Sequence, residues 1–340
     1  MNKKGQGFRK NRLFSLPGGC ILVIVALAFS LLPNLLHEAW ADSVTAGRQS
    51  SGKNIVIIAP TGKTRLSTLA KTLSASLLAK NSQLHITSLS PETVATATAI
   101  KPDIVVAIGS DSILTAEKTY RSSPALFIAT DPASYRRHKK GKRHTAILYM
   151  TQPYCRQLTF IKQLNPNWQV LSYLYSTLKK VDKKAIGRCA RKHRLETYAV
   201  QAGDIKYLTE SVNDALKHSD LLLALPDKTI YNSNTVKNIL LTSYRNRKPL
   251  IAFSANFVRA GALAAIYSDI DDLSNTAVAI LQRYIKKPGK FKRSAYYPEN
   301  FKIRINEQVF NALNLDIPDI QEIKQALLAS QRKHKPGSAE

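Results

Sequence analysis

The chain has few sulfur-containing residues and few acids. Its 340 residues include 3 cysteines and 2 methionines, and 23 acidic residues stand against 50 lysines and arginines. Only Cys155 and Cys189 lie beyond residue 41. An oxidising compartment would permit a disulfide between them. Because nothing in the sequence brings their Cα atoms within bonding distance, we expect two free thiols instead.

Long apolar runs are missing after residue 41, where no stretch approaches the roughly 20 residues needed to cross a bilayer. Before it, five basic residues among the first twelve precede an apolar run at 20–32, Pro33, and Ala-Trp-Ala at 39–41. This order predicts a cleavable secretory signal over 1–41, a linker over 42–53 and a periplasmic protein. The alternative is an uncleaved signal that anchors the chain in the inner membrane. Cys20 stands at the start of the apolar run, whereas an acylated cysteine has to follow that run, which argues against lipidation.

The charge is strongly unbalanced. The formal net charge is +27, and the predicted signal, with five bases and one acid, accounts for +4 of it. Nucleic acid is the usual partner of such a charge, but export argues against it. We expect no nucleic acid and favour an anionic membrane or envelope surface. The densest basic cluster, residues 136–144, has no aromatic residue on which bases could stack, and a solvated basic loop is expected there.

Complete catalytic and metal-binding motifs are also absent. Residues 59–64 resemble the end of a phosphate-binding loop, but the position of its first glycine is Ile57. The acidic stretch 269–272 lacks the glycine and glutamate of a calcium loop, and carboxylates at a helix N-terminus explain it better. No Gly-x-Ser-x-Gly elbow occurs. We therefore predict no enzyme, no metal and no cofactor, and nucleotide hydrolysis is a weak alternative.

Short β-branched apolar runs alternate with segments of helical period. This alternation predicts an α/β protein with parallel sheets. The expected strands are residues 54–59, 83–89, 104–108, 125–129, 145–149, 169–175, 196–200, 221–225, 250–253, 263–267 and 301–305. A helix is expected over 66–78, because leucines 66, 69, 73 and 77 share one face. Further helices are expected over 152–163, 183–194, 205–218, 233–245, 269–284, 307–313 and 318–330.

The two series of strands predict two Rossmann-like lobes that face each other across a cleft. Ligands in such sheets bind outside the carboxyl ends of the strands. The first lobe is expected to comprise 54–146 plus about 268–290. The second is expected to comprise 147–267 plus about 291–330, with a flexible tail over 331–340.

Small polar residues follow most of the predicted strands. They are Thr61, 110–112, 130–131, 176–177, Asp204, Asp227 and 254–256. Helix capping explains about half of them. Such positions also converge at the carboxyl ends, where free helix N–H groups bind anions. The pattern therefore predicts an anion-binding cleft.

Six stretches, in order along the chain, resemble the family of periplasmic substrate-binding proteins of ATP-binding-cassette (ABC) transporters whose studied members bind aromatic amino acids. They are 102–109, 123–132, 219–227, 247–253, 257–263 and 303–318. The resemblance implies the type I periplasmic-binding-protein fold. This chain differs in having the basic loop after Asp131-Pro132 and Ser274 near a position where the family has glycine.

The resemblance also implies a function and a site. The protein would bind a small ligand, an amino acid or small carboxylate, by hinge closure and deliver it to a permease. The alternative is an accessory sensing or interaction protein that has lost transport. Asp227 or Asp269 would hold a ligand ammonium, and Phe257 or Tyr267 would form an aromatic wall. The implied ligand-binding residues are Ser110, Ser112, Thr130, Asp131, Asp227, Ser254, Phe257 and Asp269.

Overall fold

The computed structural model describes residues 52–97, 99–129, 144–178, 181–203 and 205–333. The predicted signal over 1–41, most of the linker and most of the basic loop lie outside these residues, as do Thr130, Asp131, Asp204 and residues 334–340. In the described part, no helix is both long enough and apolar enough to span a membrane.

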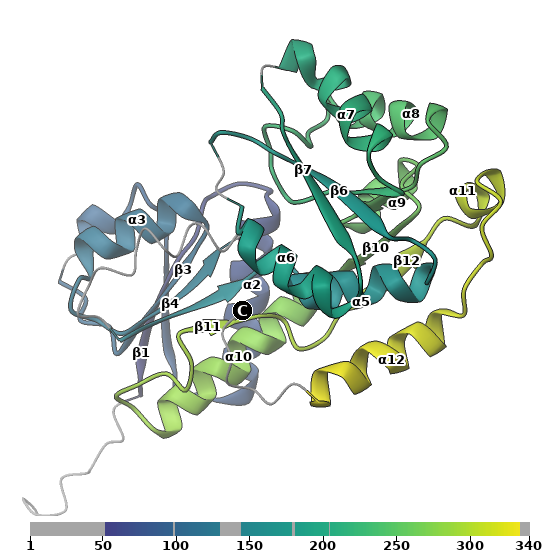
Figure 1. The fold of residues 1–340 in the computed structure, drawn as a ribbon. Coiled ribbons are helices and arrows are strands. Elements are labelled where there is room, and N and C mark those ends of the chain that lie inside the picture. The colour runs from purple at the N-terminus through teal and green to yellow at the C-terminus, as the bar shows by residue number, and fades with distance from the viewer. Residues whose placement is uncertain (1–51, 98, 130–143, 179–180, 204, 334–340) are drawn as a thin grey trace, which may run out of the picture. The chain divides into compact units, whose positions relative to one another are not determined.

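The first sheet is parallel throughout and has the strand order β11-β5-β4-β3-β1-β2. Strands β1, β3, β4 and β11 of this sheet are labelled in Figure 1. Its strands are β1 (Asn54–Ile58), β2 (His85–Leu89), β3 (Ile104–Ile108), β4 (Ala125–Ala129), β5 (Thr145–Tyr149) and β11 (Ala295–Tyr296). The inner strands β1, β3, β4 and β5 are largely apolar and buried on both faces, as expected for a parallel sheet covered by helices. The edge strand β2 is more polar and partly exposed.

Two helices cover one face of this sheet, α2 (Arg65–Lys80) and α10 (Ile270–Lys286). The other face packs against α3 (Ser110–Thr119) and the short helix η1 (Val94–Ala97). The predicted apolar face of α2 is confirmed, because its leucines 69, 73 and 77 are all buried in the core.

The second sheet has the order β12-β10-β9-β8-β6-β7, and only β12 is antiparallel to its neighbour. Its strands are β6 (Val170–Tyr175), β7 (Glu196–Gln201), β8 (Leu221–Leu223), β9 (Leu250–Ala252), β10 (Ala264–Tyr267) and β12 (Lys302–Ile305). One face packs against α5 (Tyr154–Leu164), α6 (Lys183–Lys192), α11 (Glu307–Ala312) and α12 (Ile320–Lys333). The other packs against α7 (Leu208–Lys217), α8 (Val236–Arg245) and α9 (Ala255–Arg259), with η2 (Ile205–Tyr207) before α7.

The chain passes between the sheets three times in the described part: after β5, after β10 and after β11. Each sheet is therefore built from segments that are distant in the sequence. This confirms the predicted α/β class with two Rossmann-like sheets. Sheet membership assigns β5 and β11 to the first sheet, and the exact lobe boundaries stay a prediction.

A disulfide joins Cys155 of α5 to Cys189 of α6, with the Cα atoms 4.8 Å apart. The expectation of two free thiols is therefore wrong. Both helices pack on the same face of the second sheet, and both cysteines point into the same core cluster. That packing supplies the proximity that a separation of 34 residues along the chain could not reveal.

Candidate functional site

The carboxyl end of the first sheet carries an uncapped helix N-terminus. After β3 the chain turns at Gly109, with φ of +89°, directly into α3. A side chain at this position would strain the backbone, and its Cβ would lie 2.8 Å from Cδ1 of Leu66. Among the described residues no side chain caps the helix, so its first N–H groups can serve an anion.

Ser112 lies in the first turn of α3 and is 1% exposed. Its Oγ has no hydrogen-bond partner among the described residues, and the same holds for Thr145 Oγ1, Tyr231 OH and Ser243 Oγ. Buried hydroxyls are nearly always bonded, so each exception calls for an explanation. Ser110, at the start of the same helix, is exposed. Within the described residues, the helix N-terminus therefore combines uncapped backbone donors with a buried hydroxyl that has no partner.

At the carboxyl end of the second sheet, Asp227 follows β8 and is 6% exposed. Its Oδ2 accepts a hydrogen bond of 2.7 Å from Ser176 Oγ, and its Oδ1 accepts bonds from Thr229 N and Oγ1 at 2.9 and 2.6 Å. Ser176 follows β6, so the carboxylate ties together the ends of two neighbouring strands. Asp227 is therefore a buried residue held by the protein's own hydrogen bonds, not a solvated residue of an open cleft.

Three aromatic rings cluster at the same end of the second sheet. Phe253 and Phe257 lie with ring centroids 4.8 Å apart, and Tyr231 meets both edge-on at 6.1 and 6.2 Å. Phe257 is half-buried, whereas Tyr231 is buried and its hydroxyl has no partner among the described residues. Burial, reinforced by Asp227, raises the pKa of Tyr231. Sequence reasoning chose Phe257 but missed the other two, although Phe253 ends a predicted strand.

Ser254 and Asp269 both stand at helix N-cap positions, one before α9 on the second sheet and one before α10 on the first. Ser254 precedes the short helix α9 and makes no side-chain capping bond. Asp269 caps α10, where its Oδ1 accepts from the backbone N–H of Asp272, and it forms an ion pair with Lys302. Its carboxylate is therefore already occupied by the protein, as the capping explanation predicted. In the described part, no three His, Cys, Asp or Glu side chains cluster as metal ligands.

Hydrogen bonds shift the pKa of Asp269. Partial burial acts to raise the pKa of this carboxyl, but the hydrogen bonds from Lys302 and Asp272 together outweigh it and hold the pKa below its ordinary value. Asp269 is therefore charged at neutral pH. The carboxylate is paired with Lys302, and this pairing makes Asp269 a weaker partner for a ligand ammonium.

A polar cluster centred on Ser268 joins the crossings between the sheets, and sequence reasoning missed it. Gln152, after β5, donates from Nε2 to Ser268 Oγ at 2.8 Å. That hydroxyl donates to the carbonyl of Asn300, before β12, at 2.6 Å. Arg65, at the start of α2, donates to the carbonyl of Ser268 at 2.9 Å. All three crossings thus meet at one buried residue.

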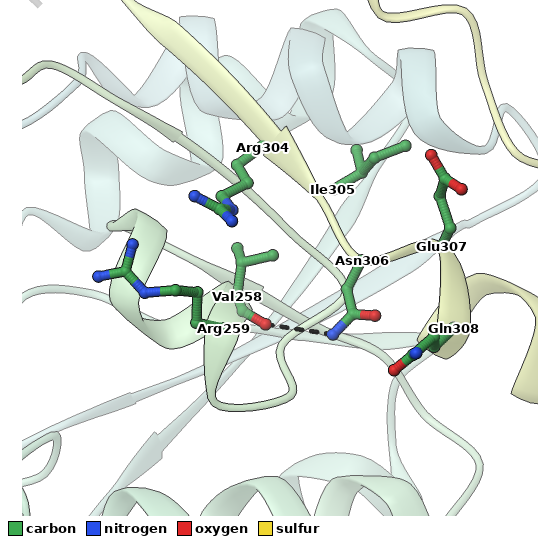
Figure 2. A pocket seen from close by; sticks show the side chains of 7 residues that line it. All are labelled: Val258, Arg259, Arg304, Ile305, Asn306, Glu307 and Gln308. Carbon is green, nitrogen blue, oxygen red and sulfur yellow. Dashed lines mark hydrogen bonds between the residues drawn. The ribbon is translucent and has the colours of Figure 1, made fainter.

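A pocket of about 270 Å³ lies at the opposite end of the second sheet, beside the first residue of β10 (Figure 2). Arg259 and Arg304 point toward each other on one side of it, and Glu307 and Gln308 lie on the other. Asn306 Nδ2 donates to the carbonyl of Val258 at 3.2 Å along its wall. None of the predicted ligand-binding residues lines this pocket.

Comparison with known proteins places these features in a family. The family model described as "ABC transporter substrate binding protein" matches residues 77–328, more than half of the chain. A comparison with curated proteins gives no significant match.

Several solved structures have a similar fold. One is from Streptococcus pneumoniae, described as an ABC domain in complex with L-Trp; it is 19% identical, with 81% of this chain and 98% of that chain covered and a TM-score of 0.57. A second is the ligand-free, open structure of a substrate-binding protein with adhesive properties from Clostridium difficile, which is 16% identical. The match covers 79% of this chain and 97% of that chain, with a TM-score of 0.63. A conserved domain protein from Vibrio cholerae is 16% identical, with 82% and 98% covered and a TM-score of 0.56. At these identities the likeness shows the fold alone.

Proposed function

The chain belongs to the family of ABC transporter substrate-binding proteins, and we propose that it binds a small carboxylate with an aromatic or apolar side, such as an aromatic amino acid. The family is one of binding proteins, not enzymes, and it implies a permease partner. The proposed site lies at the carboxyl ends of the two sheets, with the N-terminus of α3 on one and the aromatic cluster on the other.

The observation that carries this proposal is the N-terminus of α3. Its first N–H groups lack a side-chain cap, and Ser112 Oγ is buried without a partner among the described residues. A ligand carboxylate would accept hydrogen bonds from the backbone donors, and the helix dipole would favour its negative charge. The hydroxyl of Ser112 would donate a further hydrogen bond to the same carboxylate.

The aromatic cluster supports an apolar or aromatic ligand side. Phe257 and Phe253 are half-buried and stand at the end of β9, so their rings offer an apolar surface next to the carboxyl ends. Tyr231 adds a hydroxyl that lacks a partner in the described part of the chain. The complex with L-Trp described for the Streptococcus pneumoniae protein is consistent with such a ligand.

The two acidic residues are weaker candidates for a ligand ammonium. Both oxygens of Asp227 accept hydrogen bonds from the protein, and Asp269 is paired with Lys302. We therefore propose that the carboxylate of the ligand dominates recognition and that Asp227 positions the surrounding loops. Hinge closure about the cluster at Ser268 would enclose the ligand.

Export from the cytoplasm remains part of this proposal. The order of charged, apolar and small residues over 1–41 supports a cleaved signal. The disulfide between Cys155 and Cys189 supports it independently, because such bonds persist in oxidising compartments.

Calorimetric titration tests the proposed ligand class. The mature form, starting at Asp42, is titrated with L-tryptophan, with indole-3-propionate, which lacks the ammonium, and with tryptamine, which lacks the carboxylate. We expect the two carboxylates to bind and tryptamine to fail. A thermal-shift screen over other amino acids extends the test, since a ligand at a hundred times its Kd stabilises the fold by about 2.7 kcal/mol. Binding of tryptamine as tight as that of tryptophan would overturn the anion site.

A further inference from the structure

A dense group of cations lies where α10 ends and the chain turns toward β11. Residues 283–293 contain six lysines and arginines and no acid, and the nearest acids along the chain are Asp272 and Glu299. All six side chains are exposed, and within the described residues none makes an ion pair. They are Arg283, Lys286, Lys287, Lys290, Lys292 and Arg293. We call this segment the 283–293 patch.

The patch is held in a fixed shape by aromatic packing. Tyr284 and Phe291 stack with ring centroids 4.5 Å apart and are both buried in the core of the first sheet. Gly289, with φ of +115°, makes the turn between them. The backbone N–H of Arg293 donates to Tyr296 OH at 3.0 Å. The cations therefore project from an ordered turn, so little entropy is lost when they meet a charged partner.

A pocket of about 260 Å³ opens within the patch. Its walls include the two stacked rings and the side chains of Lys287, Lys290 and Lys292. Favourable interaction with the helix dipole accounts for cations in the last turn of α10, such as Arg283. It does not account for Lys290, Lys292 and Arg293, which lie beyond the end of the helix. These three side chains are exposed and make no ion pair among the described residues, so they are available to an anionic partner.

The patch belongs to a basic end of the first sheet. β11 runs parallel to β5, and Ser294 accepts from the backbone N–H of Ile147, so the patch leads into the amino end of the sheet. Lys53 and His144 directly precede β1 and β5 at the same end, and Lys101 and Arg121 lie in the loops that lead into β3 and β4. Of these, Lys53 is paired with Asp103. The candidate ligand site lies at the carboxyl end, so the two surfaces do not overlap.

We propose that the 283–293 patch docks the protein onto the phosphate headgroups of an anionic membrane surface. Lysine and arginine recognise phosphate through charge and hydrogen bonds, and a surface of many headgroups can meet six cations at once. Docking would hold the carboxyl ends, with their ligand, clear of the membrane.

Co-sedimentation with lipid vesicles tests the proposal on the mature form, which lacks the apolar run. We expect binding to vesicles that contain phosphatidylglycerol, none to pure phosphatidylcholine, and loss of binding in 0.5 M salt. Each cation at an anionic surface contributes about fivefold to affinity. The triple variant Lys287→Gln, Lys290→Gln, Lys292→Gln should therefore bind more than tenfold more weakly, whereas replacement of the same three lysines by arginine should preserve binding.

A matched control removes the same charge elsewhere. Lys184, Arg188 and Arg191 form an exposed basic row on α6, and their replacement by Gln should change vesicle affinity by no more than a few-fold. If the two triple variants lost vesicle affinity equally, net charge alone would account for binding. That result would refute docking through the 283–293 patch. Release of the bound protein by 10 mM inorganic phosphate at constant ionic strength would also refute a membrane surface and indicate a soluble phosphate site. Thermal melting of each variant checks that it folds.

Discussion

Gln152 donates a hydrogen bond of 2.8 Å from Nε2 to Oγ of Ser268, although the two residues lie 116 positions apart. Gln152 follows β5 and Ser268 follows β10, so the bond joins two different crossings between the sheets. Both residues are buried. Three segments of the chain cross between the sheets and would form the hinge. Hydrogen bonds between these segments would make them move together.

The first prediction concerns this fixed point. Ser268→Ala removes the acceptor of Gln152 Nε2 and the donor to the carbonyl of Asn300, and it leaves the buried amide of Gln152 without this partner. We expect the free energy of unfolding to fall by about 1–3 kcal/mol, measured by urea denaturation. Ser211→Ala, which removes an exposed helical hydroxyl on α7, is the control and should change stability by less than about 0.5 kcal/mol. If both variants unfolded with the same free energy, the hydrogen bonds of Ser268 would contribute nothing to the stability of the fold.

The second prediction concerns the disulfide. Alkylation of the unreduced mature protein should find no free thiol. The double variant Cys155→Ala, Cys189→Ala should lose about 3–4 kcal/mol of stability, because the bond closes a loop with a sequence separation of 34 residues in the unfolded chain. Thermal melting with and without a reductant measures the same loss. The reductant should have no effect on the double variant, and two alkylated cysteines in the unreduced protein would contradict the prediction.

Much of the fold could be predicted from the sequence, because buried parallel strands are continuous apolar runs and amphipathic helices show their period locally. The apolar face of α2 was correct for this reason. The disulfide, the burial of Asp227 and the cluster at Ser268 could not be predicted, because each depends on contacts between distant segments. Ser176 and Asp227, for example, are 51 residues apart. Phe253 did carry a signal, since it ends a predicted strand and an aromatic residue there is a candidate for a ligand wall.

The third prediction follows from the buried position of Asp227. Asp227→Ala leaves the hydroxyls of Ser176 and Thr229 and the backbone N–H of Thr229 without their acceptor. We expect a loss of about 3 kcal/mol in the free energy of unfolding, by urea denaturation. Asp227→Asn keeps one acceptor oxygen and should lose less. A variant Asp227→Ala that melts like the wild type would show that these bonds are replaced by water.

The fourth prediction is a pH dependence at the N-terminus of α10. The folded pKa of Asp269 lies below its unfolded value of about 3.9. A lowered acid pKa stabilises the fold above the unfolded pKa, and this contribution is lost as the pH falls through the folded value. Lys302→Gln removes the ion pair. The difference in stability between wild type and variant should be constant from pH 5 to 7 and shrink below about pH 4. Urea denaturation at each pH measures it, and a difference that grows in acid would contradict the assignment.

The last prediction uses the unsatisfied hydroxyls to separate binding from folding. Ser112 Oγ is buried without a partner among the described residues, so it destabilises the free protein. Ser112→Ala should therefore leave stability unchanged or raise it by about 1 kcal/mol, while it weakens binding of a ligand carboxylate by about 0.5–1.5 kcal/mol. Ser243→Ala on α8 is the matched control, because its hydroxyl is equally buried and equally unpartnered in the described part of the chain but lies away from the carboxyl ends. It should change stability in the same direction and leave affinity untouched. Calorimetric titration and melting of both variants decide the matter: a hydroxyl with no role in binding would make the two variants behave alike, whereas a ligand contact makes only Ser112→Ala lose affinity.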